Sequence, residues 1–151
     1  MNINLKSRKS QLMTVIFGCL WVYIIIWIFA GNYPWVENPY NSYLLQARRW
    51  LSGHTDLGVN YPHLEIAEYM GKYYISFPPL PSVVLLPFAI LNIPDGFASL
   101  LASLITAVYL FRIFERHSSG NPVFYTLFVM VASNLLAVSA NPWVWFIAQN
   151  M

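Results

Sequence analysis

Stretches of apolar residues alternate with short polar segments along this chain. Three of them, at 11–31, 96–114 and 122–140, come close to the roughly 20 residues that a helix needs to cross a lipid bilayer. Asn121 and Pro122 open the third stretch with a capping residue and a proline at the first helical position. The pattern therefore predicts three transmembrane helices.

The first apolar stretch follows Lys6, Arg8 and Lys9. A basic start followed by an apolar run is also typical of a signal peptide. Here the run is too long, and no small-residue cleavage site precedes Tyr33. We interpret 11–31 as a retained anchor.

The basic residues also predict the orientation, because Lys and Arg are enriched in cytoplasmic loops. Arg112, Arg116 and His117 close the second apolar stretch, as suits a cytoplasmic helix end. The chain is then a multi-pass protein of the cell (inner or plasma) membrane with a cytoplasmic N-terminus. Asn134, inside the third stretch, is explained by a hydrogen bond between helices.

The composition agrees with a membrane protein. The chain is 58% hydrophobic and 9% charged, whereas soluble domains are roughly one-quarter charged. Its single cysteine, Cys19, supplies neither a disulfide framework nor a metal-ligand spacing. The net charge of +2 says little about partners, and we expect no nucleic acid among them.

The proline-rich segment 79–94 has two interpretations. It is shorter than a spanning helix requires, and Pro87 removes a backbone hydrogen bond in its middle. If it crossed the membrane, Arg112 and Arg116 would move to the outer side. We therefore favour a re-entrant segment sheltered by the bundle over a fourth crossing.

An outer loop, 32–95, joins the first two membrane helices and holds five of the six acidic residues. Within it, 38–52 is predicted to be an interfacial helix, capped by Asn38, with Pro39 in the first turn and a stop at Gly53. Its apolar face would hold Tyr40, Leu44, Ala47 and Leu51, and its polar face Asn41, Gln46, Arg48 and Arg49. A polar excursion with turns at Gly58, Pro62 and Gly71 follows.

Motifs in this loop resemble those of a known enzyme superfamily. They are Tyr43-x-x-x-Ala47, Leu51-x-Gly53-x-x-Asp56-Leu57, Glu65-x-Ala67-x-Tyr69-x-Gly71-Lys72-Tyr73-Tyr74 and Phe77-Pro78-Pro79-Leu80-Pro81. The segment is similar to the first outer loop of GT-C glycosyltransferases, nearest to bacterial protein O-mannosyltransferases and the lipid A aminoarabinose transferase. The resemblance covers roughly 38–114, and the block from Gly71 to Pro81 is its specific part.

The resemblance implies transfer of a sugar from a polyprenyl-phosphate donor to an acceptor outside the cytoplasm. The family's acidic residue shortly before the tyrosine is here Pro39, so the catalytic acid is carried over to Glu65. This carboxylate would act as general base or hold a divalent cation. Arg48, Arg49 and Lys72 would bind the donor phosphate. Tyr73, Tyr74, Phe77, Pro78 and Pro79 would line the donor site.

Each assignment has a structural alternative. Trp35, Trp50, Tyr73, Tyr74, Trp143 and Trp145 suit an aromatic belt at the membrane interface. Arg48 and Arg49 would then bind lipid headgroups, and Glu65 and Glu68 would lie on a solvated face. His54 and His63 lack further ligands at metal-binding spacing.

The sequence as a whole predicts a single all-α integral membrane domain, 1–151. GT-C enzymes are several times longer, and no acid follows Glu115, so we expect a truncated portion of an enzyme that is inactive alone and needs a companion membrane chain. A non-catalytic multi-pass partner protein is the second hypothesis. A small transporter component ranks third, because such proteins normally place ionisable residues within their spans and the interior of the predicted spans shows none.

Overall fold

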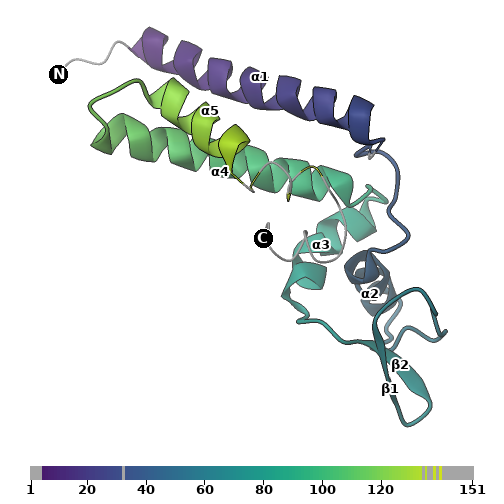
Figure 1. Ribbon diagram of the computed structural model, residues 1–151. Helices are drawn as coiled ribbons and strands as arrows, with labels where there is room; N and C mark the ends of the chain where they lie inside the picture. The colour runs from purple at the N-terminus through teal and green to yellow at the C-terminus, as the bar shows by residue number, and fades with distance from the viewer. Residues whose placement is uncertain (1–4, 32, 134, 136–137, 139, 141–151) are drawn as a thin grey trace.

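The computed structural model describes residues 5–31, 33–133, 135, 138 and 140. Trp143 and Trp145, Asn134, and part of the stretch 122–140 lie outside these residues. The described chain is mostly helical (Figure 1). Its elements are α1 (Leu5–Ala30), α2 (Ser42–Leu51), β1 (Ile66–Tyr69), β2 (Lys72–Ile75), α3 (Leu80–Ile90), α4 (Gly96–His117) and α5 (Pro122–Ala132).

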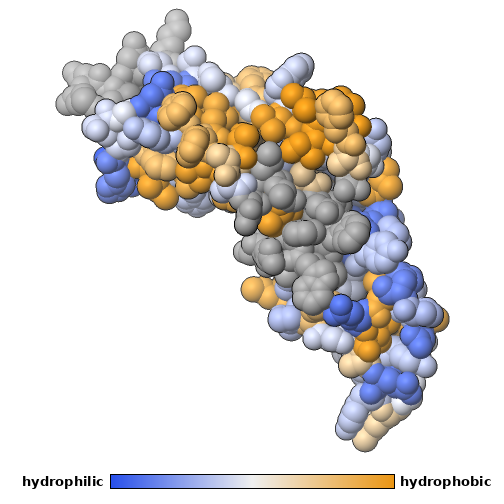
Figure 2. Space-filling model, in the orientation of Figure 1, coloured by the Kyte–Doolittle hydropathy of each residue, from blue (hydrophilic) through white to orange (hydrophobic). Residues whose placement is uncertain are grey.

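The molecule is elongated, with two parts that differ in surface character. Helices α1, α4 and α5 lie side by side as a bundle, whereas α2 and α3 pack beyond the N-terminal end of α4 (Figure 1). The hairpin of β1 and β2 projects farthest from the bundle. Apolar residues cover much of the visible bundle, and polar residues gather on the projecting part and at the opposite tip (Figure 2).

Two of the described helices are long and apolar enough to cross a membrane, Ser7–Ala30 and Gly96–His117. Core helices of soluble proteins pass the same test, but such helices are mostly buried. Here only 17% and 28% of the apolar windows are buried inside the protein. Large apolar side chains such as Phe17 and Ile105 are instead exposed. This pattern favours membrane association.

The bundle has its own core, built where α1, α4 and α5 face one another. Val15, Cys19 and Tyr23 of α1 pack with Ala107 and Phe111 of α4. Three hydroxyl groups are satisfied within their own helices: Ser103, Thr106 and Thr126 each donate to the carbonyl four residues earlier. Such bonds suit an environment without water.

Helix α5 begins as the sequence predicts. The Asn121 side chain accepts hydrogen bonds from the backbone N–H groups of Val123 and Phe124, and Pro122 follows it at the helix start. The described helix Pro122–Ala132 is shorter than a membrane span. A crossing by 122–140 therefore stays a prediction.

The predicted interfacial helix is present, but its start and its faces differ from expectation. Asn38 was expected to cap it, yet its side chain accepts from Tyr40 N–H in a preceding turn, and Asn41 is the actual cap. Tyr40 and Leu51, expected on the apolar face, are exposed. Gln46 is instead buried, because its side-chain oxygen accepts a hydrogen bond of 2.6 Å from Ser82 of α3.

A second core joins α2 to α3 and to the start of α4. Tyr43, Leu44 and Ala47 of α2 pack with Leu85 and Ala89 of α3, and Ala98 of α4 completes the cluster. Two motif residues, Tyr43 and Ala47, are thus core residues. The motif spacing Tyr-x-x-x-Ala is explained by this packing, since residues four apart share a helix face.

Helix α3 is 11 residues long and contains Pro87. At 1.5 Å per residue it extends about 16 Å, roughly half of a hydrocarbon core. A turn with Asn92 at φ 53° then leads to Asp95. The re-entrant placement of 79–94 stays a prediction that this short helix suits.

A β-hairpin occupies part of the outer loop where only turns were expected, so the chain is not entirely helical. Ile66 pairs with Ile75, and Tyr69 pairs with Lys72. Met70 and Gly71, at the centre of the turn, both have positive φ, as a type I′ hairpin turn requires. Gly71 fits this conformation without strain, which explains the turn expected there.

Candidate functional site

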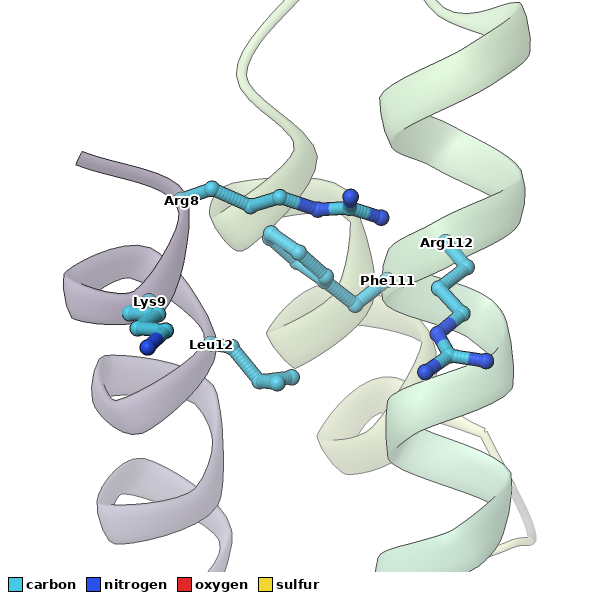
Figure 3. A pocket seen from close by; sticks show the side chains of 5 residues that line it. All are labelled: Arg8, Lys9, Leu12, Phe111 and Arg112. Carbon is cyan, nitrogen blue, oxygen red and sulfur yellow. The ribbon is translucent and has the colours of Figure 1, made fainter. Parts of the chain in front are cut away.

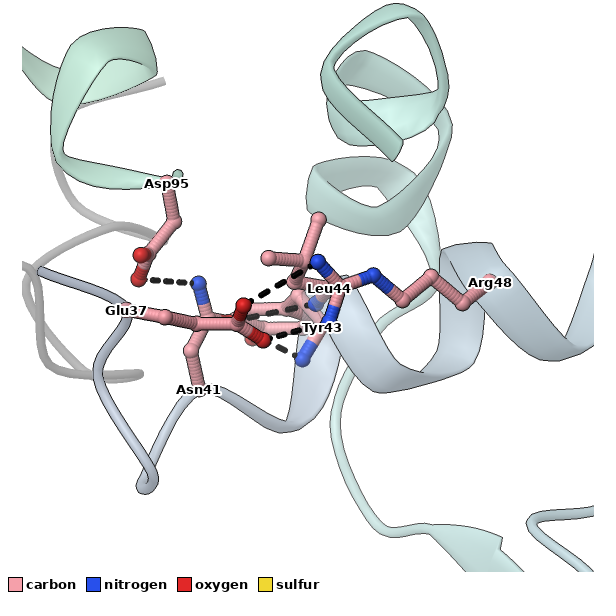
Figure 4. A network of polar contacts seen from close by, with 6 residues as sticks. All are labelled: Glu37, Asn41, Tyr43, Leu44, Arg48 and Asp95. Carbon is pink, nitrogen blue, oxygen red and sulfur yellow. Dashed lines mark hydrogen bonds and ion pairs between the residues drawn. The ribbon is translucent and has the colours of Figure 1, made fainter. Parts of the chain in front are cut away.

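Asp95 stands directly before α4 and is completely buried. Its side chain does not cap α4. Instead its Oδ2 accepts a hydrogen bond of 2.6 Å from the side-chain amide of Asn41, which stands at the start of α2 (Figure 4). A carboxyl group without exposure is rare unless it is paired or functional.

Asn41 has a double role in this arrangement. Its Oδ1 accepts from the backbone N–H groups of Tyr43 and Leu44 at 3.1 and 3.3 Å, and so caps α2. Its Nδ2 donates to Asp95. One amide side chain therefore fixes the beginning of α2 against the beginning of α4.

A bidentate ion pair lies beside this contact. Both guanidinium Nη atoms of Arg48 donate to the carboxylate of Glu37, and the Nη2–Oε2 distance is 3.1 Å (Figure 4). Both side chains are partly exposed, at 33% and 44%. Because solvent reaches the pair, it contributes little to stability and its partners can be exchanged.

Burial raises the pKa of the Asp95 carboxyl above its ordinary value, and the negative charge of Glu37 raises this pKa further. Hydrogen bonds from the Asn41 side chain and from the backbone act in the opposite direction. Within the described residues, Oδ1 of Asp95 is buried and has no hydrogen-bond partner of normal geometry. A carboxyl group with a raised pKa and an oxygen that lacks a well-formed hydrogen bond is suited to proton transfer or to ion binding.

No protein-family model, curated protein or solved structure matches this chain. The family resemblance therefore rests on the motif residues alone. What the site does has to be argued from its chemistry.

The two arginines expected to bind phosphate have different surroundings. Arg48 is paired with Glu37, close to Asp95. Arg49 points elsewhere: its Nε donates to the backbone oxygen of Asp56 at 2.9 Å, and its guanidinium lies against Gly58. Arg49 thus shapes the loop after α2, and only Arg48 belongs to the polar cluster.

Glu65 and Lys72 do not lie together. Glu65 is exposed and precedes β1 at the open end of the hairpin, whereas Lys72 is exposed beside its turn. Glu65 lies four residues before Tyr69, the partner of Lys72 in the hairpin, and four residues correspond to about 13 Å along a strand. The catalytic role of Glu65 stays a prediction, and within the described residues Glu65 forms no hydrogen bond or ion pair with Asp95.

The aromatic and proline residues expected at the donor site lie in β2 and at the start of α3, and their role in donor binding stays a prediction. Tyr73 accepts a backbone hydrogen bond of 2.8 Å from Leu57, which ties β2 to the loop after α2. Tyr74 is half-buried in the same strand. Phe77 packs against Tyr43 with ring centroids 6.0 Å apart. Pro78 and Pro79 are exposed, and Pro79 stands at the N-cap position of α3.

The two histidines of the outer loop have different surroundings. The Nε2 atom of His63 lies 3.2 Å from the Pro39 carbonyl oxygen, and its ring packs edge-on against Tyr40. His54 is exposed. Among the residues that the structure describes, no group of three or more His, Cys, Asp or Glu could hold a metal ion.

Asp95 and Glu37 are among the five acidic residues of the outer loop, but neither was predicted to be a site residue. Two signals pointed to them. Asp95 is the acid directly before an apolar helix, where a charge is costly unless it has a partner. Glu37 is close to the position at which the resembled family carries an acid. Their proximity depends on how α2 packs against α3 and α4, which spacing along the chain does not reveal.

Proposed function

We propose that this chain is the N-terminal module of a membrane glycosyltransferase, which moves a sugar from a polyprenyl-phosphate donor to an acceptor outside the cytoplasm. Its helices α1, α4 and α5 cross the cell membrane, with the N-terminus cytoplasmic. The outer loop places the site at the outer end of α4. The resemblance of the loop motifs to GT-C enzymes supports this proposal.

The observation that carries the proposal is the buried carboxyl of Asp95, with one oxygen bonded to Asn41 and the other without a hydrogen bond of normal geometry among the described residues. Glycosyl transfer needs a group that accepts a proton from the acceptor hydroxyl or holds a cation at the leaving phosphate. Asp95 has the raised pKa of such a base. We assign it this role in preference to the exposed Glu65.

Arg48 supplies the charge for the donor phosphate. Its partly exposed pair with Glu37, the acid that acts on the Asp95 pKa, holds the guanidinium at this end of α2 in the absence of donor. A phosphate offers the same bidentate geometry as the Glu37 carboxylate and carries more charge. Arrival of the donor would release Glu37, which lies near enough to raise the Asp95 pKa.

A divalent cation fits this site only together with the donor. Glu37 and Asp95 are oxygen ligands of the kind that Mg²⁺ uses, and Mg²⁺ commonly takes one or two carboxylates with substrate phosphate and water. The described residues offer no third carboxylate or histidine to the cluster. The protein groups would hold the ion, and the ion would neutralise charge on the leaving phosphate.

The exposed apolar surface favours companion helices around this module. Phe29, Phe124 and Phe128 are among the large apolar side chains that stay mostly exposed, at 86%, 59% and 59%. Lipid or a companion membrane chain would cover them. The same observation supports the second candidate, a non-catalytic partner protein. The transporter hypothesis ranks last, because the apolar spans present no buried ionisable pathway among the described residues.

Binding of the donor tests the proposal. The purified chain in neutral detergent would be titrated with a short-chain polyprenyl-phosphate hexose, and with the matching polyprenol as the uncharged control. We expect Arg48→Gln to weaken donor binding about tenfold, the loss of a charge-assisted bond. Arg116→Gln, which removes the same charge at the other end of α4, should not. Equal binding of donor and polyprenol would contradict the proposal.

A further inference from the structure

A pocket lies at the other end of the bundle, between the first turns of α1 and the last turns of α4. It has a volume of about 220 Å³ and is lined by Arg8, Lys9, Leu12, Phe111 and Arg112. Arg8 extends from α1 across the Phe111 ring toward α4, and Leu12 points into the space between the helices (Figure 3). The pocket thus combines three cationic side chains from two helices with the apolar side chains of Leu12 and Phe111.

The positive charge of this pocket is only partly compensated. Arg8 forms an ion pair of 2.8 Å with Glu115, whose side chain is 9% exposed. For the part of the chain that the structure describes, Lys9 and Arg112 have no ion pair. The pocket therefore keeps two exposed cations, and an anion would be attracted to it.

Next to the pocket, α1 and α4 carry large side chains that are exposed and mainly apolar. Met13 of α1 and Tyr109 and Ile113 of α4 are 47%, 61% and 51% exposed. An anion that also carries hydrocarbon chains could therefore lay those chains along α1 and α4. The pocket is smaller than the roughly 300–1,000 Å³ of sites for drug-sized ligands, which suits a headgroup better than a whole soluble substrate.

We propose that this pocket binds the phosphate group of an anionic phospholipid in the leaflet that faces the N-terminus. Lys9 and Arg112 contact the phosphate, Arg8 remains with Glu115, and the acyl chains lie on the exposed apolar side chains beside the pocket. Basic pockets between helices on the cytoplasmic side are suited to such headgroups. The site is separate from the Asp95 cluster, which lies at the opposite end of α4, and requires only that α1 and α4 cross the membrane.

Native mass spectrometry of the purified chain tests this assignment. Short-chain phosphatidylglycerol, the probe, would be titrated against short-chain phosphatidylcholine and against inorganic phosphate. We expect tight binding of phosphatidylglycerol alone. Lys9→Gln and Arg112→Gln should each weaken it about fivefold, since a basic residue near an anionic lipid contributes about 1 kcal/mol. Arg116→Gln, a matched control on α4 outside the pocket, should leave it unchanged.

Three results would overturn the proposal. Equal affinity for phosphatidylcholine would mean that the headgroup charge is not recognised. Equal affinity for inorganic phosphate would identify a site for free anions. Equal losses in Arg112→Gln and Arg116→Gln would mean that the whole basic helix end attracts lipid without a pocket. Lys9 and Arg112 are exposed, so thermal unfolding of the lipid-free variants should match that of the parent.

Discussion

The side-chain amide of Asn41 donates a 2.6 Å hydrogen bond to the buried carboxylate of Asp95, 54 residues later in the chain. This contact joins the cap of α2 to the start of α4 and brings the outer loop onto the bundle. It also places a buried acid beside the Glu37–Arg48 pair. The candidate site depends on this one contact between distant segments.

Substitution of Asn41 should separate its two roles. Asn41→Ala removes both the cap and the donor to Asp95, and we expect a loss of about 2–4 kcal/mol in unfolding free energy from the two effects together. Asn41→Asp keeps an equivalent cap but sets a second carboxylate against Asp95. Both variants should gain stability as pH falls, because Asp95 titrates in each, but the gain should be larger for Asn41→Asp, in which two carboxyl groups face each other. Thermal unfolding in detergent at several pH values measures this difference.

Asp95 should give the protein a pH dependence of stability. Because its folded pKa is raised, the folded state binds more protons than the unfolded state between the ordinary and the raised value, so stability falls as pH rises through that window. Asp95→Asn lacks this titration and should be more stable than the parent at neutral pH, by about 1 kcal/mol.

The difference in unfolding free energy between Asp95→Asn and the parent should become smaller as pH falls toward the ordinary pKa of aspartate. Glu37 and the other acids titrate in both proteins and largely cancel in the comparison. Denaturant unfolding of the pair across acidic to neutral pH checks this. A difference that does not change with pH, or an Asp95→Asn variant less stable than the parent, would show that burial does not raise the pKa of the Asp95 carboxyl.

Gly96 lets the segment after α1 pass close to the start of α4. A Cβ atom there would lie 2.6 Å from the Pro34 Cα and 2.8 Å from its carbonyl oxygen. Both are backbone atoms that cannot rotate away, so Gly96→Ala should cost about 1–3 kcal/mol. At Gly18 the nearest atom is the end of the Leu127 side chain at 3.0 Å, which can move. Gly18→Ala should therefore cost clearly less in the same unfolding assay.

The sequence predicts those features that depend on residues close together along the chain. The helix at 96–117 follows from an apolar run between Asp95 and the basic residues after it, and the shortness of α3 follows from its prolines. Both are local properties. Asn121 as the cap of α5 is local as well. These features were therefore predicted.

Features that depend on tertiary packing were not predicted. The hairpin strands are four residues each, and Met70 holds a positive φ that sequence preference assigns to Asn or Asp. Gln46 was placed on a polar face because its partner, Ser82, lies on another helix. The Asp95 cluster was missed for the same reason, since its members become neighbours only when α2, α3 and α4 pack.

The proposed topology can be tested by labelling single cysteines in a Cys19→Ala background. A cysteine at Ser118, after α4, should react only with membrane-permeant reagents in intact cells. One at Thr55, in the outer loop, should react with impermeant reagents as well. Reaction of the Ser118 cysteine with impermeant reagents would instead support a fourth crossing by 79–94.

The most direct test of the proposed function is to map where a donor lipid binds. A polyprenyl-phosphate hexose with a photoreactive diazirine beside the phosphate would be cross-linked to the reconstituted chain and the adducts located by peptide mass spectrometry. We expect adducts concentrated around Glu37, Arg48 and Asp95 and displaced by excess unlabelled donor. Adducts spread along α1 and α5, or unaffected by that competition, would contradict a donor site at the start of α4.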